Sequence, residues 1–203
     1  MDGGVDGSAR NLEADARDLD FVLSPTPTSA SMLLAKHFCD GASGAEVGAA
    51  ALGFVQGLAK RIDADGGAAL FVDYGADAPA ADTLRGIRNH RYVHPLHAPG
   101  ETDLSVDVDF GALARIARLQ APSLTVAPLA EQREYLAAMG LEPRVNSLLR
   151  TMDGDERAQT QLIEAATRLV ASPGMGSAYK AFAFAKEPPG APPIDGPLPG
   201  FGP

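Results

Sequence analysis

The sequence predicts one incomplete α/β domain, in which a sheet is flanked by helices. Between residues 47 and 72, a helical stripe, a glycine turn and a continuous apolar run follow one another, an order typical of an αβ unit. The 203 residues suffice for one domain with tails. No strand is followed at once by a glycine-rich loop and a helix, so we expect the fold to lack the part that holds a nucleotide-type cofactor.

Composition and charge narrow the class of partner. Hydrophobic residues make up 45% and charged residues 21% of the chain, values typical of globular proteins. Seventeen basic against 26 acidic residues give a net charge of -9, which disfavours nucleic acid and anionic lipid. Because no apolar run approaches the roughly 18 residues of a membrane span, we expect a soluble chain without membrane insertion. The single cysteine, Cys39, leaves no internal disulfide and fits a reducing compartment.

The first elements follow from local patterns. Residues 1–18 are expected to be disordered or the remnant of a hairpin; they are acidic, unlike an arginine-rich transit peptide, so no targeting segment is expected in this chain. The apolar run 19–23, stopped by two prolines, predicts a strand. Apolar residues at spacings of three and four then predict an amphipathic helix, namely Val47, Ala51, Phe54, Val55, Leu58 and Ile62.

A predicted buried strand follows this helix. Asp65-Gly66-Gly67 ends the helix with residues that adopt positive φ, and the continuous apolar run 68–72 favours a strand buried on both faces, as in a parallel sheet. The run stops at Asp73-Tyr74-Gly75. Because ligands of open α/β sheets bind at the carboxyl ends of strands, Asp73 is the first candidate for a site.

A basic and histidine-rich stretch comes next, with its charged and imidazole side chains at Arg85, Arg88, His90, Arg91, His94 and His97. Metal binding by the three histidines is disfavoured, because Pro95 interrupts any helix that would align them and the arginines repel a cation. Binding of phosphate or carboxylate by Arg85 or Arg88 is physically reasonable. Pairing of these arginines with Asp82, Asp103 or Asp107 remains an equal alternative, as does a solvated loop.

An acidic cluster follows, composed of Glu101, Asp103, Asp107 and Asp109. It could hold a cationic substrate or simply solvate a loop. Residues 103–110 alternate polar with apolar, as in a strand, but Asp109 could equally cap a helix that runs to Leu119.

The remaining elements are predicted from periodicity and breakers. We expect a short strand at 123–127, helices at 129–139 and 158–170, and a last strand at 179–185 near an edge. The proline- and glycine-rich residues 188–203 are predicted to form a disordered tail.

Several segments together resemble the MidA family. They are DGGAALFVDYG at 65–75, TLRGIRNH at 83–90 and PGETDLSVDVDF at 99–110, with further agreement at Gln132, Tyr135-Leu136, Met139-Gly140-Leu141, Arg144, Met175-Gly176 and Tyr179-Lys180. The resemblance covers about residues 19–186 and corresponds to roughly the second half of a family member, so we expect residues 19–187 to form the C-terminal half of such a domain. It implies a class I methyltransferase-like, Rossmann-like sheet whose N-terminal, cofactor-binding half has no counterpart here.

The resemblance also implies a function. Members of this family are S-adenosylmethionine-dependent methyltransferases, and the mitochondrial ones methylate an arginine of a complex I subunit during assembly of that complex. S-adenosylmethionine is therefore the cofactor of an intact member, whereas none is expected for this chain alone. The candidates for a substrate pocket are Asp73, Tyr74, Gly75, Arg85, His90, Glu101, Asp103 and Asp107. The alternative is a non-catalytic binding module, or a truncated gene product, that docks an assembly partner and can self-associate.

Overall fold

The computed structural model describes residues 19–29, 31–32, 45–78 and 81–202. These residues form two compact units. The smaller contains residues up to Thr28 together with Asp82–Val106, and the larger contains Ser29–Ala81 and Asp107–Pro203. The predictions for residues 1–18, for Cys39 and for a targeting segment concern positions outside the described residues.

The larger unit is built on a five-stranded sheet, which confirms the predicted α/β class. Its two long strands are β1 (Gly67–Ala76) and β8 (Tyr179–Lys186). They pair antiparallel, from Gly67 opposite Lys186 to Tyr74 opposite Tyr179. The predicted strand at 68–72 is therefore present but longer, and its main partner is antiparallel rather than parallel.

The two long strands differ at their outer edges. Among the described residues, the far side of β1 pairs only with β5 (Val108–Asp109), in parallel, through Gly75 and Ala76. The far side of β8 pairs with β6 (Thr125–Val126) and with β7 (Ala130–Glu131). The last strand lies near an edge, as predicted: β8 has hydrogen-bonded neighbours on both sides, but the short strands β6 and β7 beside it are the last ones on that side of the sheet.

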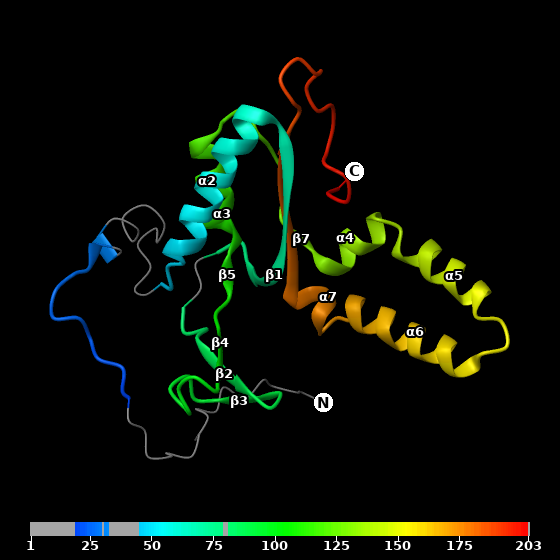
Figure 1. Cartoon of the computed structure of the whole chain (residues 1–203), viewed down its shortest axis with the longest axis horizontal. Helices are drawn as coiled ribbons and strands as arrows, with labels where there is room; N and C mark the ends of the chain where they lie inside the picture. Colours follow the sequence, from blue (N-terminus) through cyan, green and yellow to red (C-terminus); the bar gives the residue numbers. More distant parts are fainter. Residues whose placement is uncertain (1–18, 30, 33–44, 79–80, 203) are drawn as a thin grey trace, which may run out of the picture. The chain divides into compact units, whose positions relative to one another are not determined.

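Helices α2 (Ala49–Asp65) and α3 (Phe110–Gln120) lie side by side against one face of this sheet (Figure 1). Helix α2 was predicted, and α3 was one of the two alternatives left open for the residues after Asp109. Gly66 ends α2 with a φ of 79° and donates its N–H to the carbonyl of Ile62, and Asp109 caps α3 by accepting from the Ala112 N–H at 2.8 Å. Their apolar stripes form the main core with two residues of β8 and two from the connection after α3; its buried members are Leu52, Val55, Ala59, Ile62, Phe110, Ala112, Leu113, Ala117, Ala121, Leu124, Phe182 and Phe184.

The opposite face of β8 is covered by the segment that follows it. Leu198 and Phe201, which are 7% and 2% exposed, pack on the alanines at 181, 183 and 185. The Phe201 ring also lies 5.1 Å from the ring of Tyr135. Residues 188–202 form no helix or strand, yet this packing differs from the predicted disordered tail. The alanines leave room on the sheet surface, which the two large apolar side chains fill.

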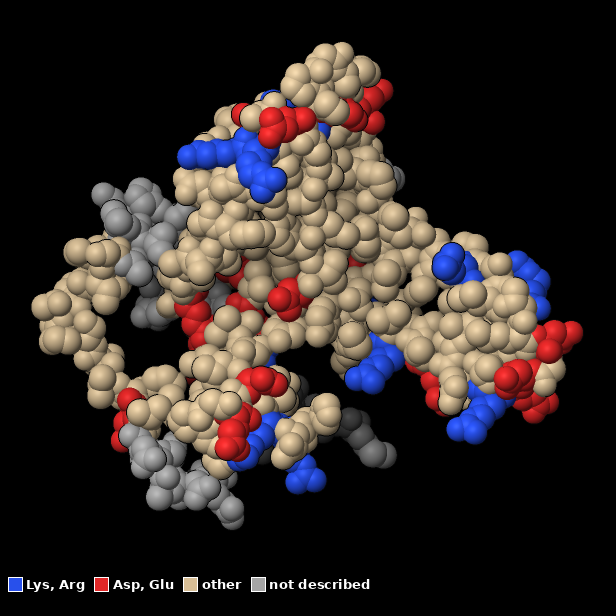
Figure 2. All heavy atoms as spheres, in the orientation of Figure 1, with Lys and Arg blue, Asp and Glu red and all other residues tan. Residues whose placement is uncertain are grey.

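Four helices link β7 to β8, namely α4 (Gln132–Ala138), α5 (Leu141–Thr151), α6 (Glu156–Val170) and α7 (Met175–Ala178). Sequence analysis predicts α4 and α6 but misses α5. Figure 1 shows α5 and α6 side by side and directed away from the sheet, and neither contains a buried residue. Figure 2 shows charged side chains of both signs over this helical pair. Among the described residues, no helix combines the length and apolar character needed to cross a membrane.

The smaller unit contains a three-stranded antiparallel sheet, in the order β3 (Arg91–Val93), β2 (Arg85–Arg88) and β4 (Asp103–Ser105). The predicted alternation after residue 103 therefore becomes β4 in this unit and β5 in the larger one. The predicted strand at 19–23 is wrong: these residues form no strand, and Leu23 is 97% exposed. An apolar run alone does not make a strand, because its backbone needs a hydrogen-bonded neighbour.

Candidate functional site

The site of the smaller unit is organised by the hairpin of β2 and β3. Asn89 and His90 form its two-residue turn, with φ values of 51° and 60°. Two successive positive φ angles are typical of a type I′ turn, whose twist matches that of the flanking strands, and Asn and His tolerate this region better than most residues. The turn therefore places Arg88 and Arg91 opposite each other at the end of the hairpin.

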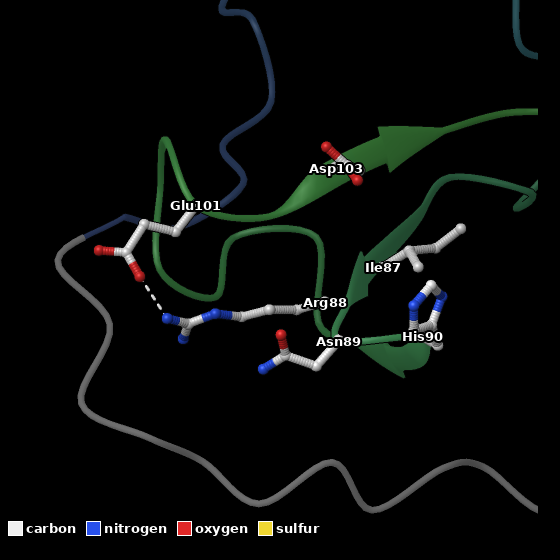
Figure 3. Close-up of a pocket in the computed structure, with 6 residues that line it drawn as sticks. All are labelled: Ile87, Arg88, Asn89, His90, Glu101 and Asp103. Atoms are coloured by element: carbon white, nitrogen blue, oxygen red, sulfur yellow. Dashed lines mark hydrogen bonds and ion pairs between the residues drawn. The ribbon is translucent and has the colours of Figure 1, made fainter.

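A surface hollow of about 460 Å³ lies against this hairpin, lined by Ile87, Arg88, Asn89, His90, Glu101 and Asp103. Figure 3 shows Arg88 and Asn89 extending toward the side of Glu101, while His90 lies beside Ile87. Asp103 comes from β4, where it pairs with Ile87 of β2. The hollow thus combines two carboxylates with guanidinium, amide and imidazole groups, so it can bind polar groups of either sign.

Arg88 is the most constrained side chain of the hollow. Its Nη2 donates to Glu101 Oε2, and its Nη1 lies 3.4 Å from His97 Nε2. The side chains of Arg88 and Glu101 are 34% and 68% exposed, so their ion pair stabilises the fold by about 1 kcal/mol at most. The two partners fix the orientation of the guanidinium more than they stabilise the unit.

Three of the predicted site residues, His90, Glu101 and Asp103, are brought together in this hollow. Arg85 does not line it, and its Nη1 donates to the Thr83 carbonyl at 3.1 Å. Sequence analysis named no role in a pocket for Asn89 and left Arg88 as an alternative anion ligand. The sequence feature that could have identified both residues is the Asn-His dipeptide, which forms a turn between two short strands. Among the described residues, no group of His, Cys, Asp and Glu is arranged to hold a metal ion.

The other predicted residues lie in the larger unit, three of them on β1. Asp73 lies within β1, not at its end, because the strand continues to Ala76. It faces Lys180 across the sheet, and its Oδ1 accepts from the Tyr74 N–H at 2.8 Å. The ring of Tyr74 contacts that of Tyr179 edge-on at 5.2 Å. A role in substrate binding stays a prediction for both.

Gly75 and Asp107 lie where β1 meets β5. Gly75 pairs with Val108, and a Cβ atom on Gly75 would lie 2.1 Å from the Val108 carbonyl oxygen. Only glycine allows the two backbones to approach in this way. Asp107 directly precedes β5. The close approach of the two strands therefore explains why glycine is needed at position 75, a structural role that sequence analysis did not identify.

The true carboxyl end of β1 borders a second hollow, of about 430 Å³. Its lining residues are Ala76, Asp77, Phe110, Ala114, Arg118, Ala127, Pro128, Leu129, Lys180 and Phe182. Nearby, Lys180 Nζ lies 3.4 Å from Glu131 Oε1. Hydrogen bonding from Arg133, with further attraction by Lys180, holds the pKa of Glu131 below its usual range. Asp77, rather than Asp73, is the acidic residue that the strand-end rule selects in this structure.

Comparison with known proteins places the chain in a family. Residues 5–127 match the family described as "Putative S-adenosyl-L-methionine-dependent methyltransferase". The chain is 41% identical over 164 residues to the mitochondrial protein arginine methyltransferase NDUFAF7 of Danio rerio, a match covering 81% of this chain and 37% of the relative. Identity to the Homo sapiens protein of the same name is 34% over 166 residues, covering 82% and 36%. The chain thus spans little more than a third of these relatives.

A solved structure shares the fold. A Burkholderia thailandensis protein crystallised with S-adenosyl-homocysteine superposes with a TM-score of 0.68 at 22% identity, over 88% of this chain and 46% of that protein. This likeness concerns the fold alone. Because the family match extends over more than half of the sequence, the chain belongs to this family of S-adenosyl-L-methionine-dependent methyltransferases.

Proposed function

We propose that this chain forms part of a mitochondrial protein arginine methyltransferase that acts on a subunit of respiratory complex I. The observation that carries the proposal is its identity of 34% to 41% with protein arginine methyltransferases over about four fifths of its length. The MidA resemblance of segments 65–75, 83–90 and 99–110 supports the same activity. The net charge of -9 also favours a cationic substrate such as an arginine-containing segment.

The described residues do not fit S-adenosylmethionine. Such a cofactor is held where a strand leads through a glycine-rich loop into a helix. After β1 the chain enters the smaller unit, and the strand-to-helix junctions at Asp109 and Glu131 are capped by the carboxylates of these residues. At each of these helix starts a carboxylate accepts from one backbone N–H group and no glycine-rich loop precedes the helix, so we assign no methyl-transfer step to this part of the chain.

The contribution that we propose for this chain is to bind the substrate. A guanidinium group stays protonated in proteins and is bound best by carboxylates. Glu101 and Asp103 line one hollow, and the Arg88 guanidinium already binds Glu101 there. Asp103 is exposed and lies on a strand of the sheet, so it is the residue best placed to hold a second guanidinium.

A reconstituted enzyme tests this function. The chain would be joined to the part of the Danio rerio relative that it does not match, and transfer of labelled methyl groups to an arginine peptide would be measured. We expect the chain alone to give no saturable calorimetric signal with S-adenosylmethionine and the hybrid to bind it. Asp103→Asn should lower kcat/KM about tenfold, or about 1.4 kcal/mol, whereas Asp153→Asn, an exposed control, should not. A hybrid that binds cofactor but methylates no arginine would refute the activity.

The non-catalytic binding module remains a second candidate because of one observation. Within the described residues, no strand pairs with the outer edge of β1 from Gly67 to Tyr74. The side chains of Leu70 and Val72 on this strand are 50% and 45% exposed. An open strand edge beside apolar side chains is a surface on which a partner can dock. Saturable binding of a complex I subunit by a hybrid that lacks activity would favour this function.

A further inference from the structure

The end of the β2–β3 hairpin places two positive charges opposite each other. Arg88 and Arg91 are direct partners in the register of the hairpin, so their side chains leave the same face of the sheet. Like charges directly opposite each other destabilise a pair of strands. Arg91 forms no ion pair with any described residue that could offset this repulsion, and it is exposed.

Both arginines line a hollow of about 410 Å³, distinct from the one that contains Asp103. The complete lining is Arg88, Asn89, Arg91, Val93 and His97. None of these residues is acidic. Two guanidinium groups, one amide and one imidazole supply hydrogen-bond donors to the same space. A hollow with this lining is suited to an anion.

The arrangement is also partly preorganised. Glu101 and His97 hold two different terminal nitrogens of the Arg88 guanidinium. A guanidinium has five N–H donors, so these two contacts leave others for a ligand. The tight turn at Asn89 and His90 fixes the backbone between the two arginines. Less conformational entropy is therefore lost when a ligand binds.

The distribution of charge in the chain favours a small anion over an extended polyanion. Segment 82–106 contains three arginines and three carboxylates, so its formal charge is zero with neutral histidines, against -9 for the whole chain. The long-range field of the chain therefore repels extended polyanions such as nucleic acid or an anionic membrane. A single oxyanion contacts only the local donors, and its charge is small enough to approach.

We propose that the hollow between Arg88 and Arg91 binds an oxyanion, the carboxylate or phosphate group of a small molecule or of a protein side chain. Two guanidinium groups can hold such a group through paired N–H donors. The site shares Arg88 and Asn89 with the hollow that contains Asp103, but anion binding can be measured without methyl transfer, so its test does not depend on the function proposed above.

The complete 203-residue chain would be titrated, at constant ionic strength, with inorganic phosphate and separately with a blocked Glu-Glu dipeptide, and binding would be followed by calorimetry and thermal denaturation. We expect saturable binding of at least one probe. Arg91→Gln should weaken it at least about tenfold. Arg168→Gln, which removes an exposed arginine of α6, should not change it. Binding of phosphate alone, or of both probes, identifies the class of oxyanion.

The stability of the unliganded chain separates a binding role from a structural one. If Arg91 serves a ligand, Arg91→Gln should leave Tm unchanged or raise it, because the opposition with Arg88 is relieved. Arg91→Lys, which keeps the charge but loses the planar fork, should bind with intermediate affinity. Absence of saturable binding by wild type, or an equal loss in Arg91→Gln and Arg168→Gln, would overturn the proposal.

Discussion

Strands β1 and β8 pair residue by residue, yet their surroundings differ. From Ala181 to Ala185 every residue of β8 is buried, because helices cover one face, Leu198 and Phe201 cover the other, and both edges are paired. In β1 no residue is fully buried. Figure 2 shows few charged side chains over the sheet of this unit. The burial of β8 follows from the elements that cover and pair with it.

The register shows where burial stops. Leu70 pairs with Ala183 and Val72 with Ala181, so these side chains share a face with the alanines that the final segment covers. The cover extends over β8 but not over β1. Leucine and valine are left half-exposed beside buried alanines, which shows that burial depends on the neighbours of a strand rather than on its own hydrophobicity.

The largest effect is expected from truncating a core side chain of β8. Phe184 is fully buried in the core cluster that contains the apolar residues of α2 and α3, so Phe184→Ala should lower the free energy of unfolding by about 3 to 5 kcal/mol. Leu70→Ala on β1 should cost about 1 kcal/mol at most. Urea denaturation followed by circular dichroism measures both. Equal losses would mean that β1 and β8 are equally buried in solution and would break the comparison.

A smaller effect is expected on association. The open edge and apolar face of β1 should allow the chain to self-associate, and Val72→Lys should shift it toward monomer. Ile163→Lys provides a matched control, since Ile163 is 50% exposed, against 45% for Val72, but lies on helix α6. Sedimentation velocity over a range of concentrations measures the change. If the two variants act alike, the surface of β1 has no special role in association.

The smallest effect is expected on the stability of the fold at low pH, through the ion pair at the carboxyl end of β8. Lys186 Nζ donates to Asp63 Oδ1 at 2.7 Å, and Ser123 also donates to this carboxylate. These hydrogen bonds, Lys186 first, hold the pKa of Asp63 below its ordinary value of 3.8. A carboxyl group whose pKa is lower in the folded than in the unfolded state stabilises the fold at pH values above its unfolded pKa. This stabilisation is lost as the pH falls through the folded pKa. Between pH 6 and 3, the Tm of Asp63→Asn should therefore fall less steeply with decreasing pH than the Tm of the wild type. Parallel curves would contradict this contribution.

The elements that were predicted correctly are those that depend on residues close together in the sequence. The stripe of α2, the Asp109 cap and the apolar run of β1 each depend on neighbouring residues, and each is present. Helix α5 was missed because Gly140 and Pro143 suggest a break. In the structure Gly140 turns the chain with a φ of 83°, and Pro143 lies in the first helical turn, where its missing N–H is not needed.

Features that depend on distant residues could not be predicted. The Ala-Phe alternation predicts the strand β8, but it does not reveal that Leu198 and Phe201, in a segment predicted to be disordered, cover its alanine face. The candidate site shows the same limit. Sequence analysis could select His90, Glu101 and Asp103 by chemical type, but only the pairing of β2 with β3 and β4 shows that they share a hollow.

The cover of β8 has a consequence for biosynthesis. Leu198 and Phe201 follow β8 in the chain, so the ribosome completes the strand before it makes the residues that shield its alanine face. A released chain that lacks these residues would expose this face, as does the surface of a folding intermediate. Stalling or premature termination between residues 186 and 198 would therefore release a product with a bare sheet face, prone to degradation.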